Sequence, residues 1–188
     1  MISAIISSGQ CAAGRGAIDA ARYAGIPLGG WYPKAAVVDR VEELRAYGLE
    51  EMESADAEVC GERNIALSDA TLILTSGHLV GTARSTAMMC DHHRKPWLHI
   101  DLDERSLRRS HLHRPPHDLA IAKKIQAWIE RRCDERDGAP EPPPVCKLYV
   151  TGRRELCPSG MRLAVKRCVV DVLIATRSAW CLPIWQLE

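Results

Sequence analysis

The residues best suited to binding chemistry in this sequence are glycines and polar or basic side chains that follow short apolar runs. The first such segment is Ser7–Arg15, between the apolar run Ile2–Ile6 and an Ala-rich stretch. Where a strand turns through glycine into a helix, free backbone N–H groups and the positive end of the helix dipole point at one spot. Such a turn binds anions, and Arg15 can add a forked cationic contact. A tight turn without a ligand is the alternative, because neither GxGxxG nor GxxxxGK followed by Ser or Thr is present.

Three further segments repeat this arrangement along the chain. Gly77–Thr82 follows the β-branched run Ala70–Ser76. Gly152 and Arg153 follow the run Val145–Thr151, and the segment GGWYPK follows a brief apolar stretch. In a parallel sheet the carboxyl ends of the strands share one edge, and ligands bind there at the switch in strand order. The convergence of these segments predicts a phosphate-bearing or oxyanion ligand.

The expected ligand-binding residues come from these four segments. Among the arginines that can neutralise an anionic ligand, we expect Arg15 and Arg153 to contact the anion ahead of Arg84 and Arg154. The complete set of expected binding residues is Ser8, Gly9, Gln10, Arg15, Gly29, Gly30, Lys34, Ser76, Gly77, Gly81, Thr82, Gly152 and Arg153.

The elements that must position these residues alternate between strands and helices. Apolar and β-branched runs predict strands, and apolar residues at helical spacing predict helices between them. This alternation predicts an α/β, Rossmann-like three-layer fold with a mostly parallel sheet of about five strands flanked by helices. The expected strands are 2–6, 70–76, 97–102 and 145–151, with a brief apolar stretch at 26–28. The first expected helix begins near Gly14, and a later one is capped by Asp118. The other expected helices are 36–46, 54–67 (capped by Ser54), 83–93 and 161–174.

Length, charge and cysteine usage narrow the class of protein. The 188 residues predict a single Rossmann-like domain over 1–174, with a Pro-rich loop at 134–144 and a C-terminal tail at 175–188. The net charge of +1 gives no global attraction to nucleic acid or to an anionic membrane. No apolar run approaches the roughly 20 residues that span a bilayer, and the N-terminus lacks a basic n-region, so the expected compartment is the cytoplasm. The eight cysteines form no CxxC pair, which favours free thiols.

Histidines and other titratable residues leave several alternatives open. His92, His93, His111, His113 and His117 resemble metal ligands, but no carboxylate or Cys accompanies them at fixed spacing, so a solvated loop is favoured and no metal site is expected.

Three further side chains each have two interpretations. Cys11 lies near a helix N-terminus, where the pKa of a thiol falls, and is either a reactive group, which the family resemblance given below implies would face molybdenum, or a small turn residue. Asp19 faces either the site or solvent. Asp101 follows a strand and either binds a ribose or pterin or caps the next segment.

The sequence resembles the putative molybdenum carrier family in several motifs. They are SSGQCAAGRGAIDAA, GIPLGGWYPK, the N-x-x-x-S-D-A-T-L-I pattern at Asn64–Ile73, the G-x-L-x-G turn at Gly77–Gly81, KPWLHIDL and TGRRE. The resemblance implies a cytosolic, oligomeric, non-catalytic protein that binds the molybdenum cofactor, a phosphorylated pterin carrying molybdate on a dithiolene. It also implies that the glycine turns hold the phosphate and oxyanion, and that molybdoenzymes are candidate partners.

The same Rossmann-like superfamily holds the cytokinin-activating nucleotide phosphoribohydrolases, which gives a second functional class. These hydrolases are characterised by a P-G-G-x-G-T-x-x-E motif, whose Glu acts near the glycosidic bond. Here residues 81–87 read GTARSTA, and no carboxylate follows before Asp91. We therefore expect a carrier and no enzyme. A nucleotide-binding relative, whether hydrolase or sensor, and a degenerate interaction module remain the alternatives.

Overall fold

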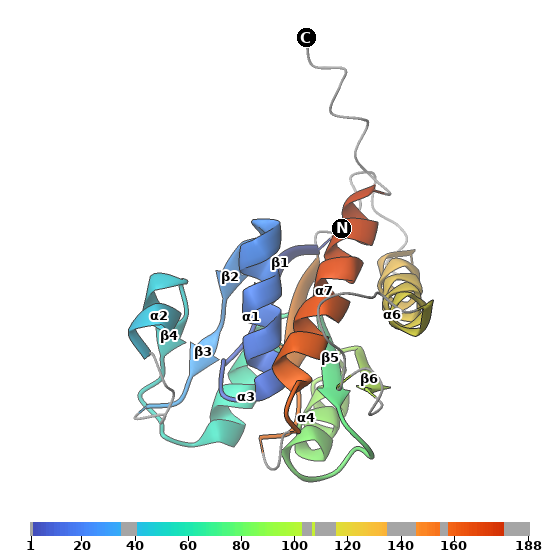
Figure 1. Cartoon of the computed structure of the whole chain (residues 1–188). Coiled ribbons are helices and arrows are strands. Elements are labelled where there is room, and N and C mark those ends of the chain that lie inside the picture. Colours follow the sequence, from blue (N-terminus) through green and yellow to red (C-terminus); the bar gives the residue numbers. More distant parts are fainter. Residues whose placement is uncertain are drawn as a thin grey trace.

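A five-stranded parallel sheet forms the centre of the computed structural model, which describes residues 2–34, 41–102, 107, 116–134, 146–154 and 158–178 (Figure 1). The strand order is β2–β1–β7–β5–β6, and each neighbouring pair is parallel. A separate two-stranded parallel ladder joins β3 and β4. The strands are β1 (Ile2–Ile6), β2 (Leu28–Gly29), β3 (Trp31–Tyr32), β4 (Glu50–Glu51), β5 (Ala70–Thr75), β6 (Trp97–Asp101) and β7 (Cys146–Thr151).

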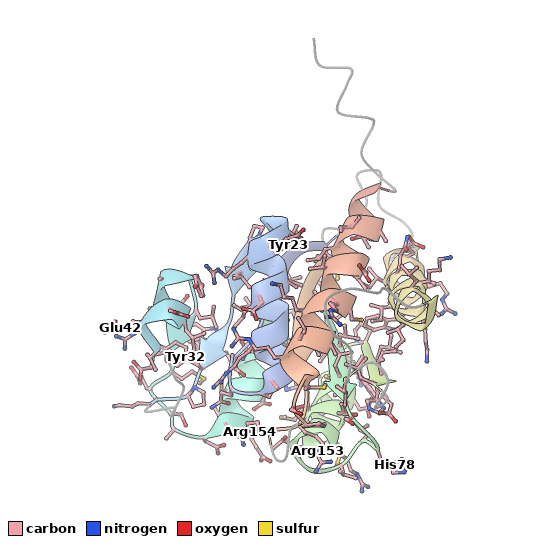
Figure 2. The ribbon with its side chains drawn as sticks, viewed as in Figure 1. Tyr23, Tyr32, Glu42, His78, Arg153 and Arg154 are labelled. Carbon is pink, nitrogen blue, oxygen red and sulfur yellow. The ribbon has the colours of Figure 1, made fainter. Side chains whose placement is uncertain are left out.

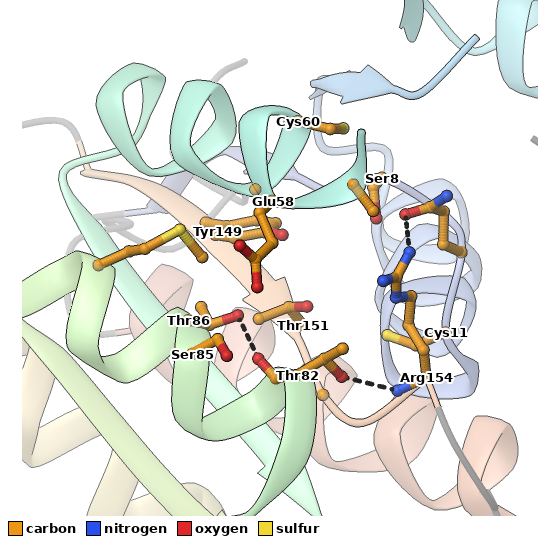
Figure 3. A pocket seen from close by; sticks show the side chains of 15 residues that line it. Ser8, Cys11, Glu58, Cys60, Thr82, Ser85, Thr86, Tyr149, Thr151 and Arg154 are labelled. Atoms are coloured by element: carbon orange, nitrogen blue, oxygen red, sulfur yellow. Dashed lines mark hydrogen bonds between the residues drawn. The ribbon is translucent and has the colours of Figure 1, made fainter. Parts of the chain in front are cut away.

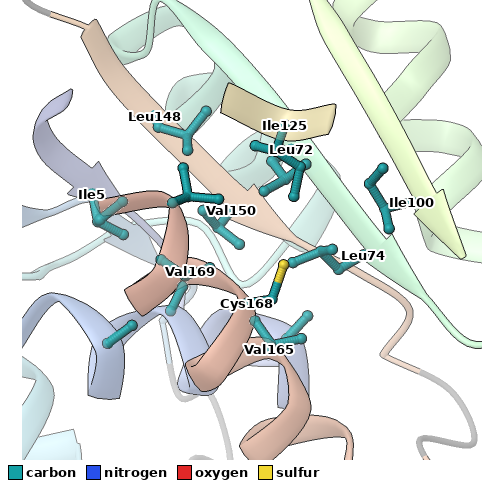
Figure 4. Close-up of a cluster of buried hydrophobic side chains, with 14 of the residues drawn as sticks. Ile5, Leu72, Leu74, Ile100, Ile125, Leu148, Val150, Val165, Cys168 and Val169 are labelled. Carbon is teal, nitrogen blue, oxygen red and sulfur yellow. The ribbon is translucent and has the colours of Figure 1, made fainter. Parts of the chain in front are cut away.

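Helices cover both faces of the sheet, so the fold has three layers (Figure 1). On one face Ile5, Leu72 and Leu148 pack with residues of α1, α6 and α7, and all three side chains are fully buried (Figure 4). On the other face Ile6 and Tyr149 pack with residues of α3 and α4. The helices are α1 (Ala12–Ala24), α2 (Val41–Ala46), α3 (Ala57–Leu67), α4 (Gly81–His92), α6 (Pro116–Asp134) and α7 (Met161–Ser178). The predicted Rossmann-like α/β class is confirmed.

Small residues on α1 let α7 approach closely. Ala17 and Ala20 are fully buried, and a Cβ at Gly16 would collide with the carbonyl oxygen of Arg162 on α7. These small residues therefore admit the backbone of a second helix.

The predicted strands and most predicted helices agree with the structure, and the differences have local causes. Ser54 is not the cap of α3, so that prediction was wrong. Asp56 is the N-cap and its Oδ1 accepts the N–H of Glu58 at 2.8 Å, while the Ser54 hydroxyl accepts the N–H of Asp56 at 3.1 Å. The helix α6 begins at Pro116, ahead of the predicted cap Asp118.

Other expectations fall partly outside the described residues. The residues not described include 36–40 of the helix predicted at 36–46, 135–144 of the Pro-rich loop and 179–188 of the tail. The helix α7 continues to Ser178, beyond the predicted end at Ile174. None of the described helices combines the length and apolar composition needed to cross a membrane.

The strand order places a switch point at β7. The β1–α1–β2 unit extends the sheet in one direction, the β5–α4–β6 unit extends it in the other, and β7 lies between β1 and β5. The carboxyl ends of β1, β7 and β5 therefore meet where Rossmann-like sheets bind ligands.

Candidate functional site

A pocket opens beyond the carboxyl ends of β1 and β7, between α3 and α4 (Figure 3). Its empty space is about 460 Å³, a figure that includes open solvent. Nine of its fifteen lining residues carry a hydroxyl, amide or charged side-chain group, and apolar surface makes up the rest of the walls. The lining residues are Ser8, Gln10, Cys11, Ala57, Glu58, Cys60, Gly61, Thr82, Ser85, Thr86, Met89, Tyr149, Thr151, Gly152 and Arg154.

The N-terminal end of α4 forms the hydroxyl-rich wall of the pocket. Thr82, Ser85 and Thr86 lie within the first two turns of this helix and line the cavity (Figure 3). The hydroxyl of Thr86 donates to the carbonyl of Thr82 at 2.9 Å. The N-cap residue Val80 makes no side-chain capping hydrogen bond to this helix. The wall therefore presents donors and the positive end of a helix dipole.

Arg154 supplies the positive charge of the pocket. Its backbone N–H donates to the Thr82 hydroxyl at 3.2 Å, which fixes the segment after β7 against α4. Its guanidinium donates to the Gln10 side-chain oxygen at 3.5 Å, a distance long enough to make this a weak contact (Figure 3). The guanidinium is therefore only lightly held and can turn toward an anion in the pocket.

Two cysteines of the pocket are engaged in holding the fold. Cys11 is the N-cap of α1, and its sulfur accepts the N–H of Gly14 at 3.2 Å. Cys60 donates its S–H to the carbonyl of Trp31 at 2.9 Å. Burial raises the pKa of the Cys60 thiol to about 12, although the charge of Arg154 opposes the shift. The Cys60 sulfur is therefore a protonated donor at neutral pH.

Asn64 holds the segment beside the pocket in the way that a neighbouring strand would. Its side chain is fully buried, its Oδ1 accepts the Trp31 N–H at 2.8 Å, and its Nδ2 donates to the Trp31 carbonyl at 2.9 Å. The adjacent Gly30 has a φ of +126°, and a Cβ there would collide with the carbonyl oxygen of Ser7. Gly29 and Gly30 were predicted to approach a ligand. In the structure the close approach at Gly30 is to the protein's own backbone, and neither residue lines the pocket.

The structure brings only part of the predicted set together. Ser8, Gln10, Thr82 and Gly152 line the pocket. Ser76 and Arg153 line a second, smaller cavity of about 230 Å³ at the end of β5 (Figure 2 labels Arg153 and Arg154). Gly9, Gly77, Gly81 and Lys34 line neither cavity.

Arg15 lies outside the lining of the pocket. Its Nε donates to the carbonyl of Gly9 at 3.0 Å, so the side chain closes its own turn. Asp19 is paired with Arg162 of α7, with Nε–Oδ2 at 2.6 Å and Nη2–Oδ1 at 2.9 Å. Asp19 therefore faces a neighbouring helix, an outcome that neither of its two interpretations anticipated. A ligand role for Arg15 stays a prediction.

Asp101 and His93 have partners within the fold. The carboxylate of Asp101 accepts the N–H of Gly77 at 2.6 Å, so it holds the turn after β5. The His93 ring contacts Glu62 at 2.7 Å. Within the described part of the chain, no three His, Cys, Asp or Glu side chains are grouped as a metal site. The side chains of His111, His113 and His117 lie outside the described residues.

Three important lining residues were missed or ranked low by sequence reasoning. Met89 comes from the middle of a predicted helix and Glu58 from near the start of another, where no strand end or glycine draws attention to them. Arg154 was ranked behind its neighbour Arg153, although Arg154 is the one that lines the pocket. The sequence feature that could have drawn attention to Glu58 is its place in the first turn of α3, directly after the N-cap region at Asp56.

A parallel α/β sheet with a pocket at its switch point defines the Rossmann-like class of folds. Residues 5–133 match the model of the circularly permutated YpsA SLOG family, and the chain belongs to that family. A crystal structure of a putative molybdenum carrier protein from Syntrophus aciditrophicus is similar over 92% of this chain and 95% of that one, with 28% sequence identity and a TM-score of 0.68. Both findings support the resemblance stated from the motifs. No curated protein matches the chain.

Proposed function

We propose that this protein binds the molybdenum cofactor, or a closely related phosphorylated ligand, in the pocket between α3 and α4 without converting it. The observation that carries the proposal is that Arg154 and the N-terminus of α4, where Val80 makes no side-chain capping hydrogen bond, lie in one pocket and are joined through Thr82. The name of the similar carrier protein supports the ligand class. Self-association and delivery to molybdoenzymes belong to the same proposal.

The donors of the pocket suit the anionic end of such a ligand. Backbone N–H groups of α4 and the hydroxyls of Thr82 and Ser85 can donate to phosphate or molybdate oxygens, and Arg154 can neutralise their charge. Ser8, Gln10 and Gly152 complete the polar wall. The thiol of Cys60 is protonated and already donates to Trp31, so it is not a ready metal ligand. The pocket therefore fits an oxyanion better than a direct bond between metal and sulfur.

A nucleotide N-glycoside hydrolase is the second candidate, and one observation favours it. The motif Glu is absent after Gly81–Thr82, but the Glu58 carboxylate enters the same pocket from α3 (Figure 3). Glu58 comes from α3, however, and not from the position after Gly81–Thr82 at which the motif places its Glu. We therefore expect no base release from a panel of nucleoside monophosphates. Release above a buffer blank that disappears in Glu58→Gln would establish the hydrolase.

Titration of a phosphorylated pterin tests the carrier proposal. A charge-assisted contact contributes roughly 1.5–3 kcal/mol, so Arg154→Ala should weaken binding about ten- to a hundredfold. Arg84→Ala is the matched control, since Arg84 is exposed on α4 and does not line the pocket. Equal losses in both variants would show that general charge, and not this pocket, attracts the ligand. Metal analysis of the natively purified protein would add whether molybdenum accompanies it.

A further inference from the structure

The pocket contains one carboxylate that binding of an anion does not explain. Glu58 lies in the first turn of α3, and its side chain extends into the cavity (Figure 3). The turn is already capped by Asp56, which accepts the backbone N–H of Glu58, so the Glu58 side chain is not needed as a cap. Among the described residues, the Glu58 carboxylate has no hydrogen-bond or ion-pair partner. A negative charge beside an anion is repulsive, so the ligand must offer this carboxylate something else.

We infer that Glu58 binds the N–H edge of a heterocycle in the ligand. The edge is the adjacent ring N–H and amino group of a 2-amino-4-oxopyrimidine, which guanine and pterin share. An ionised carboxylate has two acceptor oxygens and can accept two parallel N–H groups, as it does from a guanidinium. The inference rests on the proposed function, because it assigns the second end of the ligand whose anionic end lies at Arg154.

The walls between these two ends suit a flat ring. Ala57 of α3 and Met89 of α4 supply apolar surface to the cavity. The thioether of a methionine is polarizable and packs well against aromatic rings. Tyr149 closes the pocket at the sheet, where burial raises the pKa of its hydroxyl and keeps it neutral. A ring held against Met89 would present one edge to Glu58 while its phosphate reaches the N-terminus of α4.

Opposite charges on different walls of the pocket also fix the orientation of a bound ligand. Arg154 follows β7 and rests on Gln10, whereas Glu58 projects from α3 (Figure 3). A ligand with a phosphate and a donor edge satisfies both groups in one orientation. A ligand without the donor edge leaves the carboxylate facing the anion without compensation. The pocket therefore selects against bare anions and against bases that lack the amino group.

The experiment compares phosphorylated probes that differ only in this edge. The nucleotide arm uses guanosine monophosphate, inosine monophosphate, which lacks the amino group, and ribose 5-phosphate, which lacks the base. The pterin arm uses 6-hydroxymethylpterin phosphate and the corresponding lumazine, which has an oxygen in place of the amino group. Affinities are measured by calorimetry for the wild type, Glu58→Gln and the control Glu62→Gln. Glu62 lies one turn further along α3 and contacts His93 outside the pocket.

In at least one arm, the wild type should prefer the amino-bearing probe by about tenfold or more, the effect of one charge-assisted hydrogen bond. Glu62→Gln should keep this ratio, and Glu58→Gln should reduce it to within about twofold, because an amide offers one acceptor in place of two. The arm with the larger ratio of affinities, amino-bearing probe over its partner, identifies whether the ligand is a guanine nucleotide or a pterin. Circular dichroism of both variants confirms that they are folded.

Three results would overturn the inference. The first is equal wild-type affinity for the amino-bearing probe and its partner in both arms. The second is a ratio that survives Glu58→Gln. The third is ribose 5-phosphate binding as tightly as every base-bearing probe, which would leave the anion site of the proposed function in place. Absence of binding by all phosphorylated probes would instead overturn the proposed function and this inference together.

Discussion

Two strand-to-helix turns of this protein look alike in sequence and differ in what their N–H groups do. In the turn from β1 to α1, Cys11 caps the helix, and the Ser7 hydroxyl accepts the N–H of Gly9 at 3.2 Å. In the turn from β5 to α4, the N-cap residue Val80 makes no side-chain capping hydrogen bond, and hydroxyls of the helix line a pocket. A glycine turn therefore marks where a helix begins, and the capping residue decides whether the helix end is open to a ligand.

The arginines of the two turns show the same contrast. Arg15 belongs to the closed turn and donates to the carbonyl of Gly9. Arg154 comes from a distant part of the chain, and its backbone N–H donates to Thr82 of the open turn. Arg15, which belongs to the turn itself, thus binds the backbone of that turn. Arg154, which follows β7, lies at the pocket instead.

Closing the open turn should have the largest effect. Val80 is exposed, has extended backbone geometry and occupies the N-cap position of α4, so Val80→Asp would supply the missing cap. A new cap should stabilise the protein by about 0.5–2 kcal/mol, while the added carboxylate repels an anion and weakens its binding by about tenfold or more. Thermal unfolding and titration of a phosphorylated ligand measure the two effects. Val80→Ser is the control that adds a cap without charge. Unchanged affinity in Val80→Asp would place the anion elsewhere.

Removing the arginine of the closed turn should affect folding more than binding. Arg15→Ala deletes a hydrogen bond to a backbone carbonyl and should cost about 0.5–1.5 kcal/mol of unfolding free energy. If Arg15 serves only its own turn, ligand affinity should stay within about twofold of the wild type. Chemical denaturation and the same titration test this pair of expectations. A ten- to hundredfold loss of affinity would instead restore Arg15 as an anion ligand.

The smallest effect is expected at the cap of the closed turn. A serine hydroxyl can replace the sulfur as acceptor, so Cys11→Ser should change the unfolding free energy by less than about 0.5 kcal/mol. Cys11→Ala removes the acceptor and should cost about 0.5–1 kcal/mol. Urea unfolding of the two variants resolves the difference. Loss of ligand binding in a stable Cys11→Ser protein would favour the molybdenum-facing interpretation of this thiol.

The sequence predicted the layers of the fold more completely than the site. Runs such as Ala70–Thr75 are long and β-branched, so they indicate strands without tertiary information. The strands β2, β3 and β4 have two residues each, too few to show a period, and β3 depends on the remote side chain of Asn64. Near the N-terminus of α3, Ser54 and Asp56 are both suitable N-cap residues. The sequence alone does not indicate that Asp56 is the one that caps the helix.

Within the site, the search for turns that follow strands identified the residues at strand ends. It missed the residues that helix packing brings to the pocket. Ser8, Thr82 and Gly152 follow strands or begin a helix, so they could be predicted. Glu58 reaches the pocket only because α3 lies against α4, so closely that a Cβ at Gly61 would touch the methyl carbon of Met89 at 3.5 Å. The choice between Arg153 and Arg154 depends on the direction of the chain after β7, which spacing alone does not give.

The central position of β7 has a consequence for how the chain folds during synthesis. Residues as far apart as Ile2 and Cys146 are paired in the sheet, and β7 also pairs with β5. At typical translation speeds β7 follows β1 out of the ribosome by about 7–30 s. Until then β1 and β5 each have an unpaired edge, and their apolar faces lack α7. Nascent chains of this protein should therefore depend on chaperones that cover unpaired strands, and the sheet should form in one late, non-local step.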